Sequence, residues 1–147
     1  MEFLDALKSG WHVDQAILSE EERLVVIRFG KTGSRVCLEM DEILAKVAPL
    51  VVNFAVIYTC DTESVDDFNE MYELHGDVHL MMFFCNKHVM VDMGSGQNNN
   101  IDFVVRDIED VAILIELGFR AAKKGIGLAV SHKDFSKERG YQIKYGL

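Results

Sequence analysis

Three cysteines, Cys37, Cys60 and Cys85, are the side chains in this sequence best suited to covalent or redox chemistry. A catalytic dithiol needs two cysteines separated by two residues, and a structural zinc site needs four ligands in closely spaced pairs. The three cysteines are too widely separated in the chain to form either pattern. An odd number of cysteines, in a chain for which we expect no secretory signal, indicates reduced thiols in the cytosol or nucleus.

Two histidines have a spacing that could bind a metal. His75 and His79 are four residues apart, which on a helix would place both imidazoles on one face. Gly76 and Asp77 lie between them and favour a loop instead, and no third ligand is nearby in the sequence. We therefore predict no metal site.

Two glycine-containing segments resemble the start of a dinucleotide-binding loop, Gly94-Ser95-Gly96 and Gly125-Ile126-Gly127. The third glycine of that motif is replaced by Asn99 in the first segment and by Val130 in the second. No Gly-Lys-Ser/Thr phosphate-binding motif is present. The sequence therefore predicts no cofactor.

The spacing of apolar residues predicts the elements that would position these groups. Helices are expected over residues 11–19, from Ser34 to about Ala48, over 65–74 and within 101–124, and strands over 24–30, 54–60, 80–85 and 89–93. The first two strands, joined by a helix, should be parallel, whereas the last two should form a hairpin around residues 86–88. We expect an α/β fold of the thioredoxin-like type, a four-stranded mixed sheet flanked by helices, over residues 1–125. A basic and aromatic carboxyl-terminal extension follows over 126–147.

In a thioredoxin-like domain the chemistry lies between the first central strand and the next helix, where the helix start lowers the pKa of the attacking cysteine. Here Ser34 occupies that first position and Cys37 the second. A serine without a general base stays neutral, and His79 stands about where a proline normally precedes the third strand. We therefore predict no thiol–disulfide oxidoreductase activity and no catalytic residue.

The three thiols can also be interpreted as purely structural residues. We interpret Cys37 as a half-buried small hydrophobic residue, with a monothiol redox or redox-sensing role as the alternative. Cys60 and Cys85 end apolar strands, so both are expected to be inert core thiols.

The composition indicates one compact domain without a membrane span. The chain has 147 residues, 49% of them apolar, and a net charge of −9, and no apolar run is long and uncharged enough to cross a bilayer. Residues 1–119 contain 8 Lys and Arg against 22 Asp and Glu, whereas residues 120–147 contain 7 against 2. The basic end could attract nucleic acid or lie against the acidic remainder, and both alternatives stay open.

The carboxyl-terminal extension interleaves apolar and aromatic residues with Lys and Arg: Phe135, Tyr141, Ile143, Tyr145 and Leu147. Such a pattern can bind RNA through stacking and charge. It can equally pack against its own domain or a protein partner, which we favour.

Several long blocks closely resemble the Dim/Dib family, small thioredoxin-like proteins of the U-five particle in the spliceosomal tri-snRNP. The resemblance runs from about Trp11 to Lys133, and VIRFG and the asparagine-rich block are specific to this family. The blocks are WHVDQAILSEEERLVVIRFG (11–30), CLEMDEIL (37–44), VVNFAVIYTCD (51–61), DFNEMYEL (67–74), NKHVMVDMGSGQNNN (86–100) and RAAKKGIGLAVSHKDFS (120–136).

The resemblance implies a non-enzymatic, nuclear splicing factor that serves as a protein-interaction scaffold in the tri-snRNP. The implied partners are tri-snRNP proteins and a polyglutamine-tract-binding protein, with the pre-mRNA 5′ splice site and snRNA nearby. No membrane contact is implied, and the protein is expected to be a monomer outside the complex.

The sequence departs from the family pattern in three places. Residues 33–36 replace the usual aromatic, acidic and proline residues before Cys37, and Gly76-Asp77-Val78 replaces the usual Asp-Pro-Cys. A disulfide to that last position, considered for some relatives, is impossible here. The end of the chain, 137–147, also differs, so the resemblance implies no partner contact through those residues.

Overall fold

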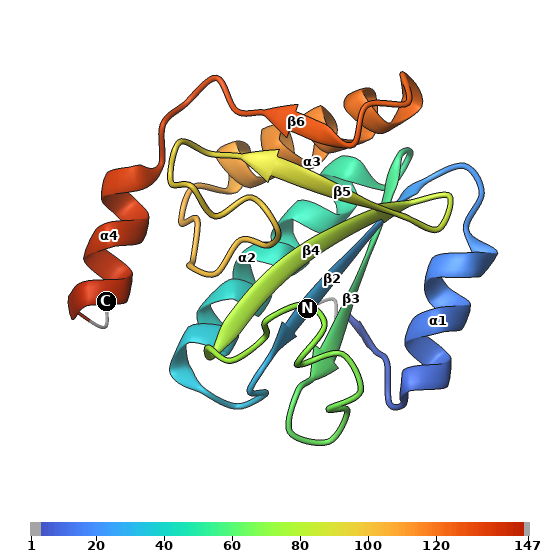
Figure 1. The fold of residues 1–147 in the computed structure, drawn as a ribbon, viewed down its shortest axis with the longest axis horizontal. Coiled ribbons are helices and arrows are strands. Elements are labelled where there is room, and N and C mark those ends of the chain that lie inside the picture. Colours follow the sequence, from blue (N-terminus) through green and yellow to red (C-terminus); the bar gives the residue numbers. More distant parts are fainter. Residues whose placement is uncertain (1–3, 146–147) are drawn as a thin grey trace.

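The computed structural model describes residues 4–145, which form a mixed sheet with helices on both faces (Figure 1). The elements follow one another as β1 (Asp5–Ala6), α1 (Gly10–Ser19), β2 (Leu24–Gly30), α2 (Arg35–Val51), β3 (Ala55–Asp61), β4 (Val78–Phe84), β5 (Lys87–Asp92), α3 (Ile108–Lys123), β6 (Leu128–Val130) and α4 (Ser136–Tyr145). The strand order in the sheet is β1-β3-β2-β4-β5-β6.

β2 is the centre of the sheet because every residue of LVVIRFG is buried, as a strand covered on both faces requires. It runs parallel to β3 and antiparallel to β4, and β4 and β5 form an antiparallel hairpin. The parallel first pair and the hairpin predicted from the sequence are therefore confirmed, as is the thioredoxin-like class of fold. The predicted turn at residues 86–88 is wrong, because β5 begins at Lys87 and the turn is formed by Cys85 and Asn86.

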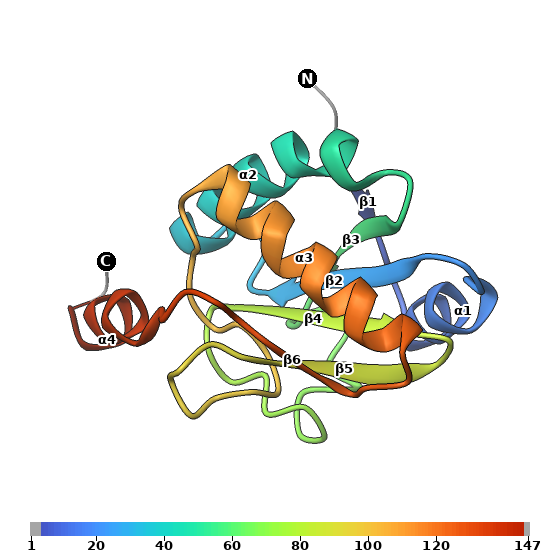
Figure 2. The same cartoon turned by 90° about the horizontal axis from the view of Figure 1, so that it is seen from above.

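Two apolar clusters fill the space above and below the sheet. The larger cluster packs under α2 and α3, which lie side by side over one face (Figure 2). The smaller cluster joins α1, through Val13 and Ile17, to the segment around Phe68 and Tyr72 on the other face. The layers thus bury both faces of the central strands.

The predicted number of four strands is wrong, because the sheet has six. The two additional strands, β1 and β6, contain two and three residues. Elements this short contain too few residues to show an alternating pattern. They pair parallel to β3 and β5, respectively.

The predicted helix over 65–74 is also wrong, since this segment forms a series of turns. Its apolar residues do have helical spacing, and Phe68 and Tyr72 stack with ring centroids 5.9 Å apart. The helix does not propagate, because Glu73 has a positive φ of 57° and Leu74 N–H bonds to Asn69 C=O. The spacing reflects isolated turns packed on the sheet.

The ends of α2 and α3 explain why these helices begin and stop where they do. Ser34 caps α2, its Oγ accepting from Cys37 N–H at 3.3 Å, as the sequence predicted. α2 runs on to Val51, past the predicted end near Ala48, because Pro49 lies in its last turns, where the lost N–H removes only one bond. Gly125, at φ 75°, follows α3 as predicted, and its N–H bonds to Ala122 C=O.

Part of the predicted extension belongs to the sheet and the core. β6 pairs with β5, and Ala129 and Phe135 are buried in the larger cluster. α4 buries no side chain. Polar contacts with residues 102–104 attach it to the rest of the domain. The division of the chain at residue 125 stays a prediction, and Leu147 lies outside the described residues.

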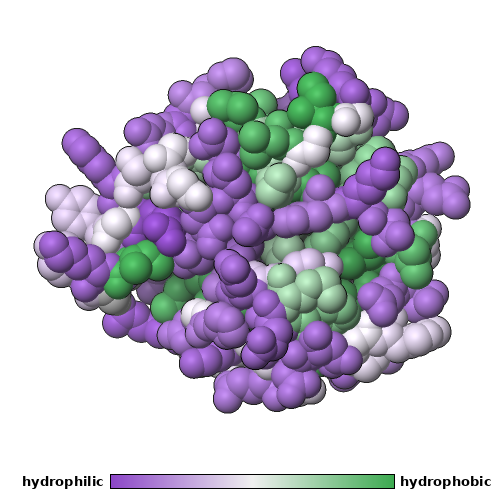
Figure 3. Space-filling model, in the orientation of Figure 1, coloured by the Kyte–Doolittle hydropathy of each residue, from purple (hydrophilic) through white to green (hydrophobic). Residues whose placement is uncertain are grey.

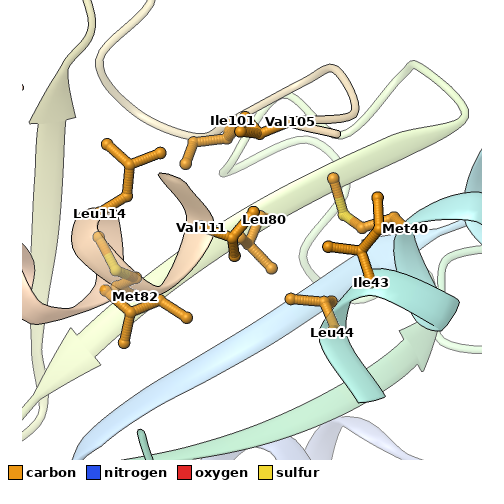
Figure 4. Close-up of a pocket in the computed structure, with 10 residues that line it drawn as sticks. Met40, Ile43, Leu44, Leu80, Met82, Ile101, Val105, Val111 and Leu114 are labelled. Atoms are coloured by element: carbon orange, nitrogen blue, oxygen red, sulfur yellow. The ribbon is translucent and has the colours of Figure 1, made fainter. Parts of the chain in front are cut away.

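A small apolar cavity lies between α2, α3 and β4 (Figure 4). Its volume of about 10 Å³ is at the lower limit for one water molecule, and an apolar cavity of this kind stays dry. It therefore offers no room for a cofactor. The lining residues are Met40, Ile43, Leu44, Leu80, Met82, Ile101, Val105, Val111, Leu114 and Ile115.

Candidate functional site

The position where thioredoxin-like domains carry their chemistry is here a closed hydrogen-bonded junction. Cys37, in the first turn of α2, has no exposed surface. Its Sγ donates to the Asp77 carbonyl oxygen at 3.0 Å, and Lys31 N–H donates to the same oxygen at 2.9 Å. The thiol therefore ties α2 to the loop before β4.

Gly30 makes this junction possible. A Cβ at residue 30 would overlap the Asp77 carbonyl oxygen and Cys37 Sγ. The end of β2 can therefore approach both groups only because it carries no side chain.

The thiol of Cys37 is held in its neutral form. Burial raises the pKa of Cys37, although nearby Arg28 and the hydrogen bond with Ser34 act in the opposite direction. Burial is the largest cause, so the helix start does not yield a thiolate here. Cys37 is more deeply buried than the sequence suggested, and Ser34 is engaged as the helix cap.

The other two cysteines differ from one another. Cys60 is buried in β3, and burial raises its pKa to about 11. Cys85 is exposed, so its predicted place in the core is wrong. It forms the β4–β5 turn together with Asn86, and both residues have positive φ, which moves Cys85 out of the strand.

We expect iodoacetamide at pH 8 to modify Cys85 first, with Cys60 and Cys37 reacting far more slowly. A pKa of about 11 for Cys60 leaves it roughly a hundredfold or more less thiolate than a free cysteine. Site-resolved mass spectrometry over time measures the order. In urea all three should react alike, and a folded protein in which Cys37 reacts as fast as Cys85 would contradict the buried junction.

Arg28 lies beneath the junction and was not singled out from the sequence. It is 1% exposed, and its guanidinium donates to both carboxylate oxygens of Asp41, at 2.7 and 2.9 Å. Thr32 Oγ1 and the Cys60 carbonyl accept weaker bonds at 3.4–3.5 Å. The available signal was a single charge inside the otherwise apolar run 24–30.

His79 is a structural residue buried in β4. Its Nε2 accepts from Gly76 N–H at 2.9 Å, so the proton resides on Nδ1, which faces Asn100 Oδ1 at 2.9 Å. The Asn100 amide in turn donates to the Tyr72 carbonyl at 3.3 Å. His79 thus links the loop before β4 to the segment after β5, through a neutral ring.

His75, the other histidine whose spacing could have bound a metal, is exposed in the loop before β4. Within residues 4–145, no three His, Cys, Asp or Glu side chains gather as a metal site would require. His79 uses both ring nitrogens for hydrogen bonds, so neither is available to a metal.

A groove of about 410 Å³ lies next to the junction. The start of α2, the loop before β4 and α4 enclose it through Val36, Asp77, Phe103 and Ile143, among others. Acidic and apolar side chains share its walls, and it contains no nucleophile with an adjacent base.

The basic carboxyl-terminal part of the chain does not form one positive surface. The end of α3 and helix α4 lie at opposite sides of the molecule (Figure 1). Lys133 pairs with Asp110 and Arg139 with Asp102, both at 2.8 Å. Of the two alternatives for this segment, the structure favours the one in which it lies against the acidic domain.

α4 is held by a bidentate contact between a side chain and the backbone. Gln142 Oε1 accepts from Val104 N–H at 2.8 Å, and Gln142 Nε2 donates to the Val104 carbonyl at 2.7 Å. Tyr141 and Tyr145 stay exposed beside it.

In the described part of the chain, no helix has the length and apolar character needed to span a bilayer.

Comparison with known proteins gives a consistent set of relatives. The family model described as "Mitosis protein DIM1" matches residues 3–135. Spliceosomal protein DIB1 of Candida glabrata is 52% identical over 139 residues, which cover 95% of this chain and 98% of that protein. Mitosis protein dim1 of Schizosaccharomyces pombe has the same identity and the same coverage.

Among solved structures, the fold resembles thioredoxins. The thioredoxin of Fasciola hepatica superposes with a TM-score of 0.61 over 77% of this chain and 97% of its own, at 12% identity. This likeness concerns the fold alone, since the two sequences are so different.

Proposed function

Because the chain belongs to the family of mitosis protein DIM1, we propose that it is a subunit of the spliceosome that acts in pre-mRNA splicing by binding other proteins. The observation that carries this proposal is an identity of about half over nearly the whole chain to proteins named as spliceosomal. The thioredoxin-like fold then serves as a scaffold.

The geometry of the junction supports a non-enzymatic role. The one thiol at this position is buried, bonded to a backbone carbonyl and shifted towards its neutral form. Thiol exchange needs an accessible thiolate, which Cys37 does not provide. The monothiol alternative using Cys37 therefore has no support from the site.

The proposed partners are proteins of the tri-snRNP, and the proposed location is the nucleus. A monomeric state outside the complex and proximity to snRNA or the 5′ splice site are part of the same proposal. The surface supports protein contacts, since it combines a mixed acidic and apolar groove with exposed aromatic residues on α4.

Affinity purification of the tagged full-length chain from nuclear extract tests this function. We expect recovery of U-five RNA together with large spliceosomal proteins. Cys37→Ala should recover the same set, because the scaffold role does not use the thiol. Circular dichroism establishes that each bait is folded.

A folded bait that recovers neither the RNA nor spliceosomal proteins would refute the proposal. Loss of recovery in folded Cys37→Ala would instead point to a function of the thiol.

A further inference from the structure

The outer edge of β6 has unpaired backbone groups. Met90 N–H donates to the Gly127 carbonyl at 2.8 Å, and Ser131 N–H donates to the Asp92 carbonyl at 2.9 Å. In a parallel ladder, alternate residues face the neighbouring strand, so Leu128 and Val130 direct their N–H and C=O groups away from β5. β6 ends the sheet order, so no described strand lies on that side.

A length of three residues limits pairing at this edge, because very short edge strands are one protection against it, but β6 has no other protection. Exposed sheet edges commonly carry proline, charge or a bulge that prevents pairing with another chain. β6 consists of Leu128, Ala129 and Val130 and has none of these. Val130 is 60% exposed and Ile126 is 50% exposed, and apolar side chains gather over β6 at the top of the view in Figure 3.

The charge around the edge selects the partner. Residues 117–133 contain four Lys and Arg and no Asp or Glu, in a chain whose net charge is −9. Arg120 and Lys133 pair with carboxylates, which leaves Lys123 and Lys124 exposed at the end of α3, with residues 125–127 between them and the strand. A second copy of the chain would bring these same cations together, so like-charge repulsion disfavours self-pairing.

We propose that β6 is a docking edge that adds an extended, acidic segment of a partner protein as a further strand of the sheet. The outward groups of Leu128 and Val130 would form its hydrogen bonds, while apolar side chains of the segment would contact Val130 and Ile126. Acidic side chains of the segment would face Lys123 and Lys124.

The β6 edge should bind such a segment whether or not the protein belongs to the spliceosome. A peptide experiment with the isolated chain therefore tests the edge independently of the affinity purification. The probe is an acetylated heptapeptide of alternating glutamate and valine, and its lysine–valine counterpart is the charge control. Amide NMR of the full-length chain is recorded during each titration. We expect shifts centred on residues 126–131 with the glutamate peptide only, weakening as salt is raised.

Two variants make the test specific. Val130→Pro removes an outward N–H without removing a bond to β5 and should abolish binding. Replacing both Lys123 and Lys124 by Glu should lower the affinity for the glutamate peptide by about tenfold or more and raise the affinity for the lysine peptide. Lys8→Glu with Lys46→Glu changes the net charge equally, away from β6, and should leave the preference unchanged.

The charge variants keep the test valid if Val130→Pro does not fold. The proposal is overturned if neither peptide shifts residues 126–131 at millimolar concentration, or if both peptides bind equally. It is also overturned if the free protein forms a dimer that protects the Leu128 and Val130 amides from exchange.

Discussion

Replacing Gly30 by alanine should destabilise the fold by about 3 kcal/mol, near the upper end of the range for overpacking a core. The added methyl would overlap both the Asp77 carbonyl and Cys37 Sγ, and Val78 Cα lies 3.2 Å from its position. Two of these three neighbours are backbone, which cannot rotate away. Urea unfolding followed by circular dichroism measures the change in the free energy of unfolding.

Gly127→Ala is the matched control. A Cβ at Gly127 would meet no atom within 4 Å, so its effect should stay within about 0.5 kcal/mol. Cys37→Ala in the Gly30→Ala background should recover only part of the loss, because the Asp77 carbonyl remains. Equal stability of the Gly30 and Gly127 variants would show that β2 does not approach the loop so closely.

Asp41→Ala should cost about 3 kcal/mol, the lower end of the range for breaking a buried ion pair, because the Arg28 side chain is buried whereas that of Asp41 is 28% exposed. Arg28 would keep its charge in the core with only the long contacts to Thr32 and the Cys60 carbonyl. Thermal and urea unfolding both report the loss. The control is Glu39→Ala, whose 3.0 Å pair with Arg106 lies on the surface and should contribute less than about 1 kcal/mol.

Removing both charges separates the cost of an orphaned cation from the value of the pair. Arg28→Met with Asp41→Leu should be considerably more stable than Asp41→Ala, because apolar residues of similar volume can replace a buried pair. A loss below about 1 kcal/mol for Asp41→Ala would mean that water reaches Arg28 in solution.

The parts of the fold that the sequence predicted are those determined locally. The β-branched, largely apolar run 24–30 is typical of a buried strand, and Ser34 and Gly125 signal helix ends through their own chemistry. The errors fall where local pattern is weak or misleading. β1 and β6 are too short to show a period, and the helical spacing in 65–74 ends at a positive φ that no residue type announces.

The candidate site was harder to predict because its contacts join distant residues. The sequence placed Cys37 and His79 at two positions that matter for chemistry in thioredoxin-like domains, and it contains no pair of cysteines separated by two residues. It could not show that Cys37 bonds to the carbonyl of Asp77, forty residues later, or that Arg28 of β2 meets Asp41 of α2. Cys85 was wrongly assigned to the core because β4 ends one residue earlier than predicted, at Phe84, which places Cys85 in the turn.

The attachment of α4 through Gln142 and Arg139 implies that the chain has two levels of cooperativity. α4 buries no side chain, whereas Phe135, just before it, is only 2% exposed and belongs to the core. Detachment of the helix would therefore break a few polar contacts and expose almost no apolar surface. Such a segment opens by sub-global unfolding at a small fraction of the global free energy, with Phe135 as the hinge at which the opening stops.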